Sequence, residues 1–198
     1  MPERSLVLAS GSPARLRLLR DAGFAPTVVV SGVPEDDPDD AGAGSMALRL
    51  AERKAVAVAR PDGDAVVVGC DSILEFEGRR HGKPSSAEEA LRWLRAMRGR
   101  EGTLHTGHCL VDERTGGRVS AVAATVVRFG DADDAELEAY VATGEAAAVA
   151  GAFTLDGRSA PFIDGIVGDP SNVIGLSLPM FRTLLRRLGI PVTALWAR

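Results

Sequence analysis

A short apolar run and a helical pattern meet in the stretch Leu6-Val7-Leu8-Ala9-Ser10-Gly11-Ser12-Pro13-Ala14-Arg15. Ser12 is a good N-cap and Pro13 suits the first helical position, so the sequence predicts a strand, a turn and a helix that begins here. The free N–H groups and the positive dipole end of such a helix attract anions, and Ser10 and Arg15 lie close by. The local sequence is compatible with an ordinary capped turn or with a phosphate site.

The composition is typical of a globular protein, with 45% hydrophobic and 25% charged residues. Its length suits one domain, residues 1–198, with enough chain to bury a core. A net charge of −4 does not favour nucleic acid or an anionic membrane as partner, and no apolar run approaches the roughly 18 residues that span a bilayer. The N-terminus lacks a signal-peptide core, so we expect a cytoplasmic protein. The oligomeric state stays open, with a homodimer as one alternative.

The cysteines and histidines do not have the spacing of a soft-metal site. Cys70 and Cys109 each lie inside an apolar run, without a CxxC or zinc pattern, and are expected to be buried thiols. His105 and His108 are three residues apart in a strand-like segment, which would direct them to opposite faces. This counts against both histidines binding one metal.

Lysine is scarce in this chain. Of the 23 basic residues, 21 are arginine and only Lys54 and Lys83 are lysine. A compact ammonium fits places where a planar guanidinium does not, so both lysines are candidate site residues. Chance retention is the alternative.

The rest of the chain alternates strand and helix patterns. The predicted strands are 26–31, 65–70, 73–76, 103–111 and 119–129, the last two forming a hairpin. The predicted helices are capped by Ser12, Ser45, Ser86 and Asp133, and a last helix begins at Pro179. Residues 150–177 are rich in glycine and read as irregular. This pattern predicts an α/β fold with a mixed sheet.

Asp71 directly follows the predicted strand 65–70, whose β-branched composition is typical of a strand buried on both faces. Open α/β sheets bind ligands beyond their strand ends, so this carboxylate is a candidate to hold a divalent metal or take a proton from water. Considered alone, Asp71 is equally explained as a turn-capping residue.

Several charged and polar residues accompany Asp71. Glu35 adds a second carboxylate, Lys54 and Lys83 add two ammonium groups, and the turn at 10–15 adds an anion site. Carboxylate oxygens, lysines and a helix N-terminus together suit polyphosphate chemistry with Mg²⁺ or Mn²⁺. In such chemistry the cations stabilise phosphate charge and one carboxylate activates water.

The chain resembles the Maf family over nearly its whole length. The matching motifs, in order, are Leu8-Ala9-Ser10-Gly11-Ser12-Pro13, Arg15, Glu35, Lys54-Ala55, Gly69-Cys70-Asp71-Ser72, Gly82-Lys83-Pro84, Thr106-Gly107, Tyr140, Gly144-Glu145, Ala150-Gly151-Ala152-Phe153 and Asn172-Val173-Ile174-Gly175-Leu176.

This resemblance implies a nucleoside triphosphate pyrophosphatase that cleaves between the α- and β-phosphates. It also implies a mixed twisted sheet in two lobes, like that of inosine triphosphatases, with the nucleotide in a central cleft. By the family pattern, Asp71 would accept the proton, Glu35 and Asp71 would hold the metal, and Lys54 and Lys83 would serve the metal and phosphates. Ser10, Ser12 and Arg15 would hold the triphosphate.

Three departures from the family pattern concern the substrate. The first of the two arginines common after Ser-Pro is Ala14 here, and Ala148-Val149 stands where many members have Asp-Lys. Substrate choice in the family is associated with the positions of Arg15, Ser72 and Asp156. Arg15 and Ser72 are similar to the subgroup that takes dTTP and UTP, whereas Asp156 is acidic, as in the subgroup that prefers a methylated guanosine triphosphate. A carboxylate only accepts hydrogen bonds, whereas the subgroup's amide also donates, so we expect a broad or altered base specificity.

Two other function classes compete with a hydrolase that removes non-standard nucleotides. A nucleotide-binding regulator of cell division would need little catalysis, and the retained Asp71, Glu35 and both lysines count against it. A nucleic-acid-binding module is disfavoured by the negative charge and by only nine aromatic residues among 198.

Overall fold

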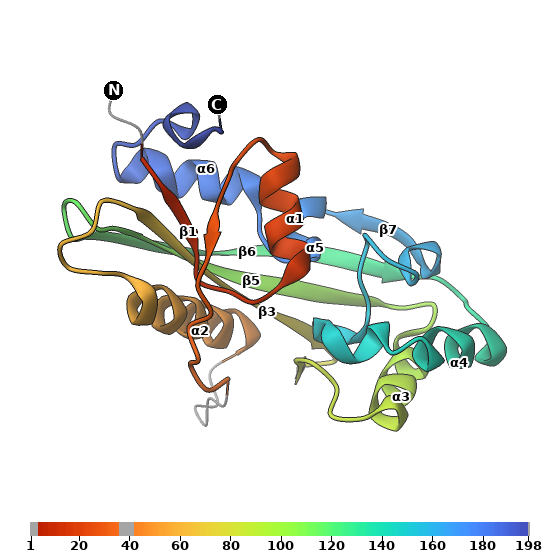
Figure 1. The fold of residues 1–198 in the computed structure, drawn as a ribbon. Coiled ribbons are helices and arrows are strands. Elements are labelled where there is room, and N and C mark those ends of the chain that lie inside the picture. Colours follow the sequence, from red (N-terminus) through yellow and green to blue (C-terminus); the bar gives the residue numbers. More distant parts are fainter. Residues whose placement is uncertain (1–3, 36–41, 198) are drawn as a thin grey trace.

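A single mixed sheet forms the centre of the molecule in the computed structural model, which describes residues 4–35 and 42–197 (Figure 1). In this part of the chain the strands are β1 Leu6–Leu8, β2 Thr27–Val28, β3 Val66–Phe76, β4 Arg79–His81, β5 Glu101–Asp112, β6 Gly117–Phe129 and β7 Ile163–Val167. The helices are α1 Pro13–Asp21, α2 Ala43–Val58, α3 Ala87–Met97, α4 Asp134–Ala142, α5 Pro170–Ile174 and α6 Leu178–Arg187, with short 3-10 turns η1 Glu145–Ala148, η2 Ala150–Ala152, η3 Ala160–Phe162 and η4 Val192–Leu195. None of these helices has the length and apolar character that crossing a membrane requires.

The strand order is β2-β1-β3-β5-β6-β7, with β4 paired to β3 away from this path. The pairs β2–β1 and β1–β3 are parallel and the others are antiparallel. This arrangement confirms the prediction of an α/β fold with a mixed sheet, including the hairpin of β5 and β6.

β3 is one continuous strand of eleven residues, so the predicted break at Asp71-Ser72 is wrong. β5 pairs with β3 in unbroken register from Val66 opposite Asp112 to Glu75 opposite Thr103, and these ladder bonds keep the backbone extended through Asp71. Asp71 therefore lies inside a strand rather than beyond its end.

The other edge of β3 is paired only at its two ends. β1 pairs with residues 66–68 and β4 with residues 74–76, and within the described residues no strand pairs with 69–73 along that edge. Asp71 and Ser72 thus lie at a gap in the sheet, just beyond the carboxyl end of β1. Asp71 therefore does lie beyond a strand end, but the strand is β1 and not the predicted strand 65–70.

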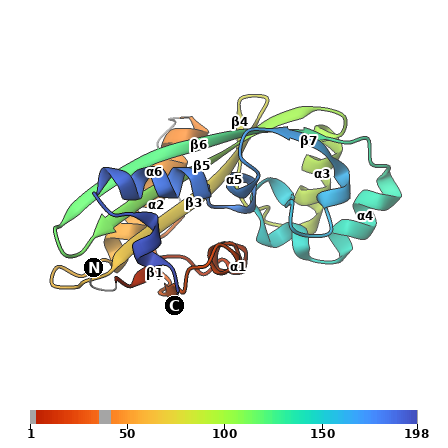
Figure 2. The same cartoon turned by 90° about the horizontal axis from the view of Figure 1, so that it is seen from above.

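α2 lies on one face of the sheet, and α5 and α6 lie on the other (Figure 1, and Figure 2 from above). Gly69 and Gly107 allow the close approach of α2, since a Cβ atom at either position would come within 2.3 Å of a backbone oxygen of Ala51 or Ala47. The two glycines therefore set the distance between α2 and the strand that carries Asp71.

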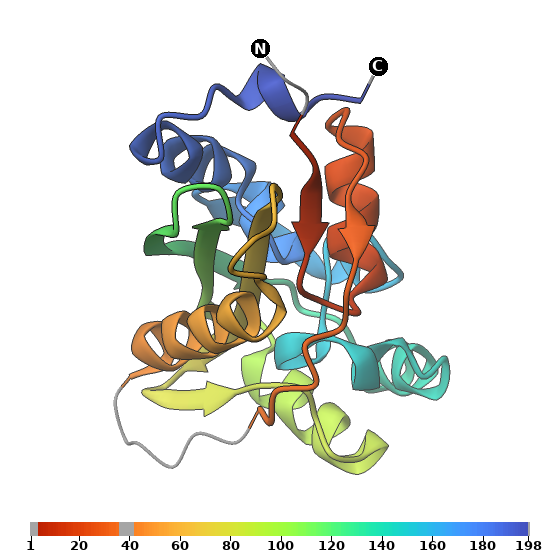
Figure 3. The ribbon, with the colours of Figure 1, turned by 60° about the vertical axis from the view of Figure 1, so that its left-hand side comes forward.

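Buried apolar side chains gather at two ends of the long strands. One cluster joins β1 and α1 to α6 and contains Leu8, Leu19 and Phe181. The other joins the far end of β3 to α3 and α4 and contains Leu74 and Tyr140, among others. The two clusters make the two lobes that the family resemblance implies, with α1 and α6 at one end of the molecule and α3 and α4 at the other (Figure 3). The strands β3, β5 and β6 run through both lobes (Figure 1).

Three element boundaries differ from the sequence-based expectations. The prediction that Ser45 caps the second helix is wrong: the N-cap is Gly42, and the buried Ala43 and Ala47, which belong to one apolar cluster with Ile73, extend the helix by almost a turn. The predicted strand 26–31 shrinks to Thr27–Val28, since its partner β1 has only three residues. Residues 150–177, predicted to be irregular, contain β7 and α5.

Candidate functional site

A cavity of about 880 Å³ opens at the gap beside β3. Segments from both lobes line it, including the turn between β1 and α1 and residues 148–154 on the opposite side. Eight of the nine candidate residues line this cavity, namely Ser10, Ser12, Arg15, Glu35, Lys54, Asp71, Ser72 and Lys83. Asp156 does not; it lies on the loop that follows η2.

Lys54 joins the two carboxylates of the cavity. It projects from α2 and is 6% exposed, and its Nζ donates to Asp71 Oδ1 at 2.5 Å and to Glu35 Oε1 at 2.8 Å. Lys83 Nζ lies 3.6 Å from the other oxygen of Glu35. The two lysines and two carboxylates thus form one charged cluster, although they come from four separate segments of the chain.

The charges around Glu35 determine its protonation. Partial burial by itself would raise the pKa of this carboxyl group, but the hydrogen bond from Lys54 and the charges of Lys54, Lys83 and Arg15 outweigh burial. The pKa of Glu35 is therefore lowered below its ordinary value. Glu35 is an anion at neutral pH, which suits it to hold a cation.

The turn from β1 to α1 has the predicted cap. Ser12 Oγ accepts from the N–H of Arg15, and Pro13 occupies the first turn. Arg15 folds back under this turn: its Nη1 donates to Ser10 Oγ at 3.1 Å, its Nε to the Gly175 carbonyl at 2.7 Å, and its Nη2 to Ser72 Oγ at 3.1 Å. These bonds hold a buried positive charge beside the helix N-terminus, where it can attract phosphate.

A buried polar network supports Arg15 and Ser72 from behind. Ser72 Oγ is bonded to Thr106 Oγ1 at 2.9 Å, and Thr106 Oγ1 lies 3.2 Å from the Asn172 carbonyl. Asn172 Nδ2 donates to the Leu104 carbonyl at 3.2 Å, and both Thr106 and Asn172 are fully buried. Reasoning from chemistry alone did not select Thr106 or Asn172; their only signal was their presence in the family-like motifs.

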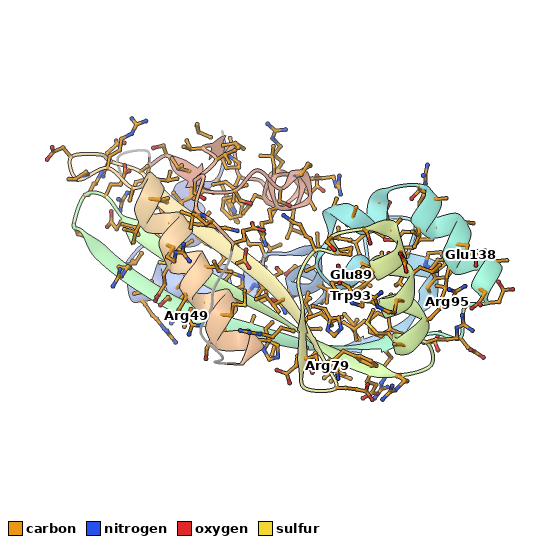
Figure 4. The ribbon with its side chains drawn as sticks, turned by 90° about the horizontal axis from the view of Figure 1, so that it is seen from below. Arg49, Arg79, Glu89, Trp93, Arg95 and Glu138 are labelled. Carbon is orange, nitrogen blue, oxygen red and sulfur yellow. The ribbon has the colours of Figure 1, made fainter. Side chains whose placement is uncertain are left out.

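Lys83 is held by the segment between β4 and α3. His81 packs edge-on against Trp93 of α3 with ring centroids 4.7 Å apart, and the Gly82 carbonyl accepts from the N–H of Gly151. Figure 4 shows Trp93 and Glu89 on α3 near this segment. Ser86 caps α3 as predicted, and the carboxylate of Glu89 accepts from the N–H and the hydroxyl of Ser85. These contacts fix the backbone on both sides of Lys83, whose side chain is 55% exposed.

Asp156 contacts residues at the rim of the cavity. Its Oδ2 forms an ion pair with Arg17 of α1, and its Oδ1 accepts from Thr154 Oγ1 at 2.5 Å. Thr154 lines the cavity, as does Arg80, and neither residue was selected from the sequence.

The donor set of the cavity suits a hard cation. Two carboxylates, from Glu35 and Asp71, face the same ammonium, and Mg²⁺ commonly takes one or two protein carboxylates together with substrate phosphates and water. Within residues 4–35 and 42–197, no three His, Cys, Asp or Glu side chains are grouped to hold a metal by themselves. The acidic run at 36–40 lies outside the described residues. Among the described residues, Glu35 and Asp71 would hold the metal, and substrate phosphates and water would complete its ligands.

The cysteines and histidines take no part in this cluster. Cys70 and Cys109 are fully buried, as predicted, and burial raises the pKa of each thiol to about 12. His105 faces α2, near Gly44, whereas His108 faces the opposite side and accepts from the N–H of Ser177, which confirms their predicted opposite orientation.

Comparison with known proteins gives matches over almost the entire chain. A family model described as Maf-like protein matches residues 5–188. A protein of Streptomyces coelicolor named nucleoside triphosphate pyrophosphatase is 60% identical, covering 99% of this chain and 96% of the relative. Proteins of the same name from Streptomyces avermitilis and Mycobacterium tuberculosis are 57% and 48% identical, with at least 94% of every chain covered. All of the cavity-lining residues fall inside the matched region.

Proposed function

This chain belongs to the Maf family, and on that premise we propose that it is a nucleoside triphosphate pyrophosphatase that releases the nucleoside monophosphate and pyrophosphate. The observation that carries the proposal is the charged cluster, in which Lys54 bonds both Asp71 and Glu35 inside a cavity that also contains a helix N-terminus. Such a cavity has cationic groups for the phosphates and carboxylates for water and metal.

The proposed reaction is attack of water on the α-phosphorus. Asp71 accepts a proton from water, the water oxygen forms a bond to phosphorus, and the bond to the bridging oxygen breaks. Pyrophosphate leaves with that electron pair, and the proton passes from Asp71 to solvent. Lys54 bonds Asp71 through Oδ1, so within the described residues Oδ2 is the oxygen left to take the proton.

The cationic groups of the cavity are suited to different phosphates of the substrate. Arg15 and the first turn of α1 are suited to hold the β- and γ-phosphates, because both offer N–H groups or positive charge to an anion. Lys83, at the cavity wall, is suited to offset charge that develops on the leaving pyrophosphate. A Mg²⁺ or Mn²⁺ ion held by Glu35 and Asp71 would supply Lewis-acid stabilisation of the phosphate oxygens.

The substrate is proposed at two levels. The class is a nucleoside triphosphate, with removal of non-standard nucleotides as the role. The proposed base is thymine or uracil, as in dTTP and UTP, or a modified base. Arg15 and Ser72 are similar to the family subgroup that takes dTTP and UTP, whereas Asp156 is acidic, as in the subgroup that prefers a methylated guanosine triphosphate.

The test is a panel of nucleoside triphosphates assayed with Mg²⁺, with Mn²⁺ and with chelator, in which monophosphate and pyrophosphate are measured separately. Asp71→Asn is assayed alongside, and Asp62→Asn, in an exposed loop after α2, is the matched control. We expect pyrophosphate release that needs both metal and Asp71, with nucleotide still bound by Asp71→Asn. Orthophosphate in place of pyrophosphate would contradict the reaction. Binding without turnover across the panel would favour the nucleotide-binding regulator.

A further inference from the structure

An ion pair connects the two walls of the cavity at its rim. Arg17 of α1 bonds Oδ2 of Asp156, 139 positions later in the chain. Arg17 lies two residues after Arg15, and Asp156 lies two residues after Thr154, and both Arg15 and Thr154 line the cavity. The pair therefore joins the segment beside the proposed phosphate end to a segment on the opposite wall.

The loop that carries Asp156 is fixed from within. Ser159 is 1% exposed, and its Oγ accepts from the N–H of Thr154 at 2.8 Å and donates to the Thr154 carbonyl at 2.9 Å. Glu145 Oε1 accepts from the N–H of Arg158 at 2.9 Å. Because the backbone of Thr154 is anchored on both its N–H and its carbonyl, what this residue offers to a ligand depends on its hydroxyl group.

The carboxylate of Asp156 determines the direction of the hydroxyl proton. An ionised carboxylate accepts and cannot donate, so the 2.5 Å bond between Thr154 Oγ1 and Asp156 Oδ1 uses the single hydroxyl proton of Thr154. The hydroxyl oxygen also accepts from the N–H of Asp156 at 3.4 Å, so one lone pair is left to offer to the cavity. In this geometry Thr154 accepts a hydrogen bond from a bound ligand and cannot donate one.

Arg17 holds Asp156 in the orientation that makes this possible. It engages Oδ2 and leaves Oδ1 to Thr154, so both carboxylate oxygens are occupied. The Arg17 side chain is 55% exposed, and an exposed ion pair adds little to stability, so the contact matters more for orientation than for folding.

We propose that Arg17 is a specificity-determining positioning residue, which acts through Asp156 to present Thr154 as a hydrogen-bond acceptor to the nucleotide. The favoured ligands are nucleotides that direct an N–H or O–H group toward Thr154, and nucleotides that present only an acceptor there are disfavoured. This inference rests on the proposed function for its ligand class, and it concerns residues outside the charged cluster.

The test compares the nucleotide ranking of four proteins: wild type, Arg17→Ala, Arg17→Lys and Arg20→Ala. Arg20 lies on the exposed face of the same helix and serves as the control. For each nucleotide we would measure kcat and KM, and also the equilibrium Kd in the Asp71→Asn background. We expect Arg17→Ala to change the KM ratio between nucleotides by about two- to fivefold, the size of effect that an exposed ion pair can supply. Arg17→Lys should retain the wild-type ranking because it keeps the pair, and Arg20→Ala should leave it unchanged.

Thr154→Val gives the second arm of the test, since it removes the hydroxyl with little change of shape. We expect it to alter the ranking in the same sense as Arg17→Ala, with no further change in the double variant, because both act through one hydroxyl. Equal effects of Arg17→Ala on every nucleotide, no effect at all, or additive effects of the two substitutions would overturn the inference.

The inference and the proposed function fail in different ways. If wild-type protein released no pyrophosphate from any nucleotide, the proposed function would fall, and the Kd ranking would still decide the role of Arg17. If turnover occurred and the ranking did not respond to Arg17→Ala, the function would stand and the inference would fall. An absence of both turnover and nucleotide binding would overturn both.

Discussion

The two walls of the cavity are built in different ways. The wall that carries Asp71 and Lys54 consists of β3 and α2, packed closely through Gly69 and Gly107, and both site residues are buried. The opposite wall, which carries Lys83 and residues 148–154, consists of short turns; residues 151–154 are buried, whereas the Lys83 side chain is 55% exposed. Regular, buried elements hold side chains more rigidly than loops, whereas loops vary more easily. We therefore expect the first wall to carry most of the reaction, with Lys83 as the contribution of the second wall, and residues 154–156 of the second wall to adjust the choice of substrate.

The two lysines offer the most direct way to break this comparison. Lys54→Arg should lower kcat at least about 100-fold, because a planar guanidinium does not fit the buried position between two carboxylates and disrupting a buried pair costs about 3–5 kcal/mol. Lys83→Arg, at a half-exposed position, should cost only a few-fold, in line with the weak energies of exposed pairs. Steady-state kinetics on one substrate would compare them. Similar losses in both variants would mean that the walls do not differ in rigidity.

Gly69→Ala tests whether close packing of the first wall is needed. The added Cβ would lie 2.3 Å from the Ala51 carbonyl oxygen, so α2 must move away from β3. We expect a loss of about 1–3 kcal/mol in unfolding free energy, together with weaker activity because Lys54 moves away from Asp71. Gly165→Ala is the control, since a Cβ there meets no atom within 4 Å. Denaturant unfolding and kinetics on both variants give the answer, and a normal stability for Gly69→Ala would contradict the packing argument.

The same difference between the walls explains what the sequence could predict. The first wall depends on local patterns, namely the β-branched run before Asp71 and the rarity of Lys54 in an arginine-rich chain, and the Ser12 cap of α1 is a local pattern as well. The gap beside β3 could not be predicted, because it depends on how far β1 and β4 extend along the edge of a third strand. The contact of Asp156 with Arg17 could not be predicted from the sequence either, because it joins an irregular segment to a helix 139 positions away.

The buried His108 provides a further test, through the dependence of the free energy of unfolding on pH. Burial, helped by the charge of Arg15, lowers the pKa of His108 to about 4. Between that value and the ordinary pKa of 6.5 the unfolded chain binds a proton that the folded protein excludes, so stability falls as the pH drops below 6.5. We expect a loss of about 2 kcal/mol from pH 7 to pH 5.

The variant for this experiment is His108→Gln, which keeps an acceptor for the N–H of Ser177 and does not titrate. The informative quantity is the slope of unfolding free energy against pH between 7 and 5, a range above the lowered pKa of Glu35. The slope should flatten in His108→Gln, whatever its absolute stability. His108→Asn provides a second variant if the first folds poorly. An unchanged slope would mean that other groups carry the pH dependence.

The smallest expected effect belongs to the second wall, at Asp156. Asp156→Gln replaces a group that only accepts hydrogen bonds with one that also donates, and it removes the ion pair with Arg17. We expect the substrate preference to move about two- to fivefold towards dTTP and UTP, with a much smaller change in kcat than Lys54→Arg causes. Asp164→Gln, on the exposed side of β7, is the matched control. A change in kcat shared by all nucleotides would assign Asp156 to the reaction and remove the division between the walls. A change confined to the ranking of nucleotides would support the division between the walls. Asp71 would then act in the reaction and Asp156 in the choice of substrate.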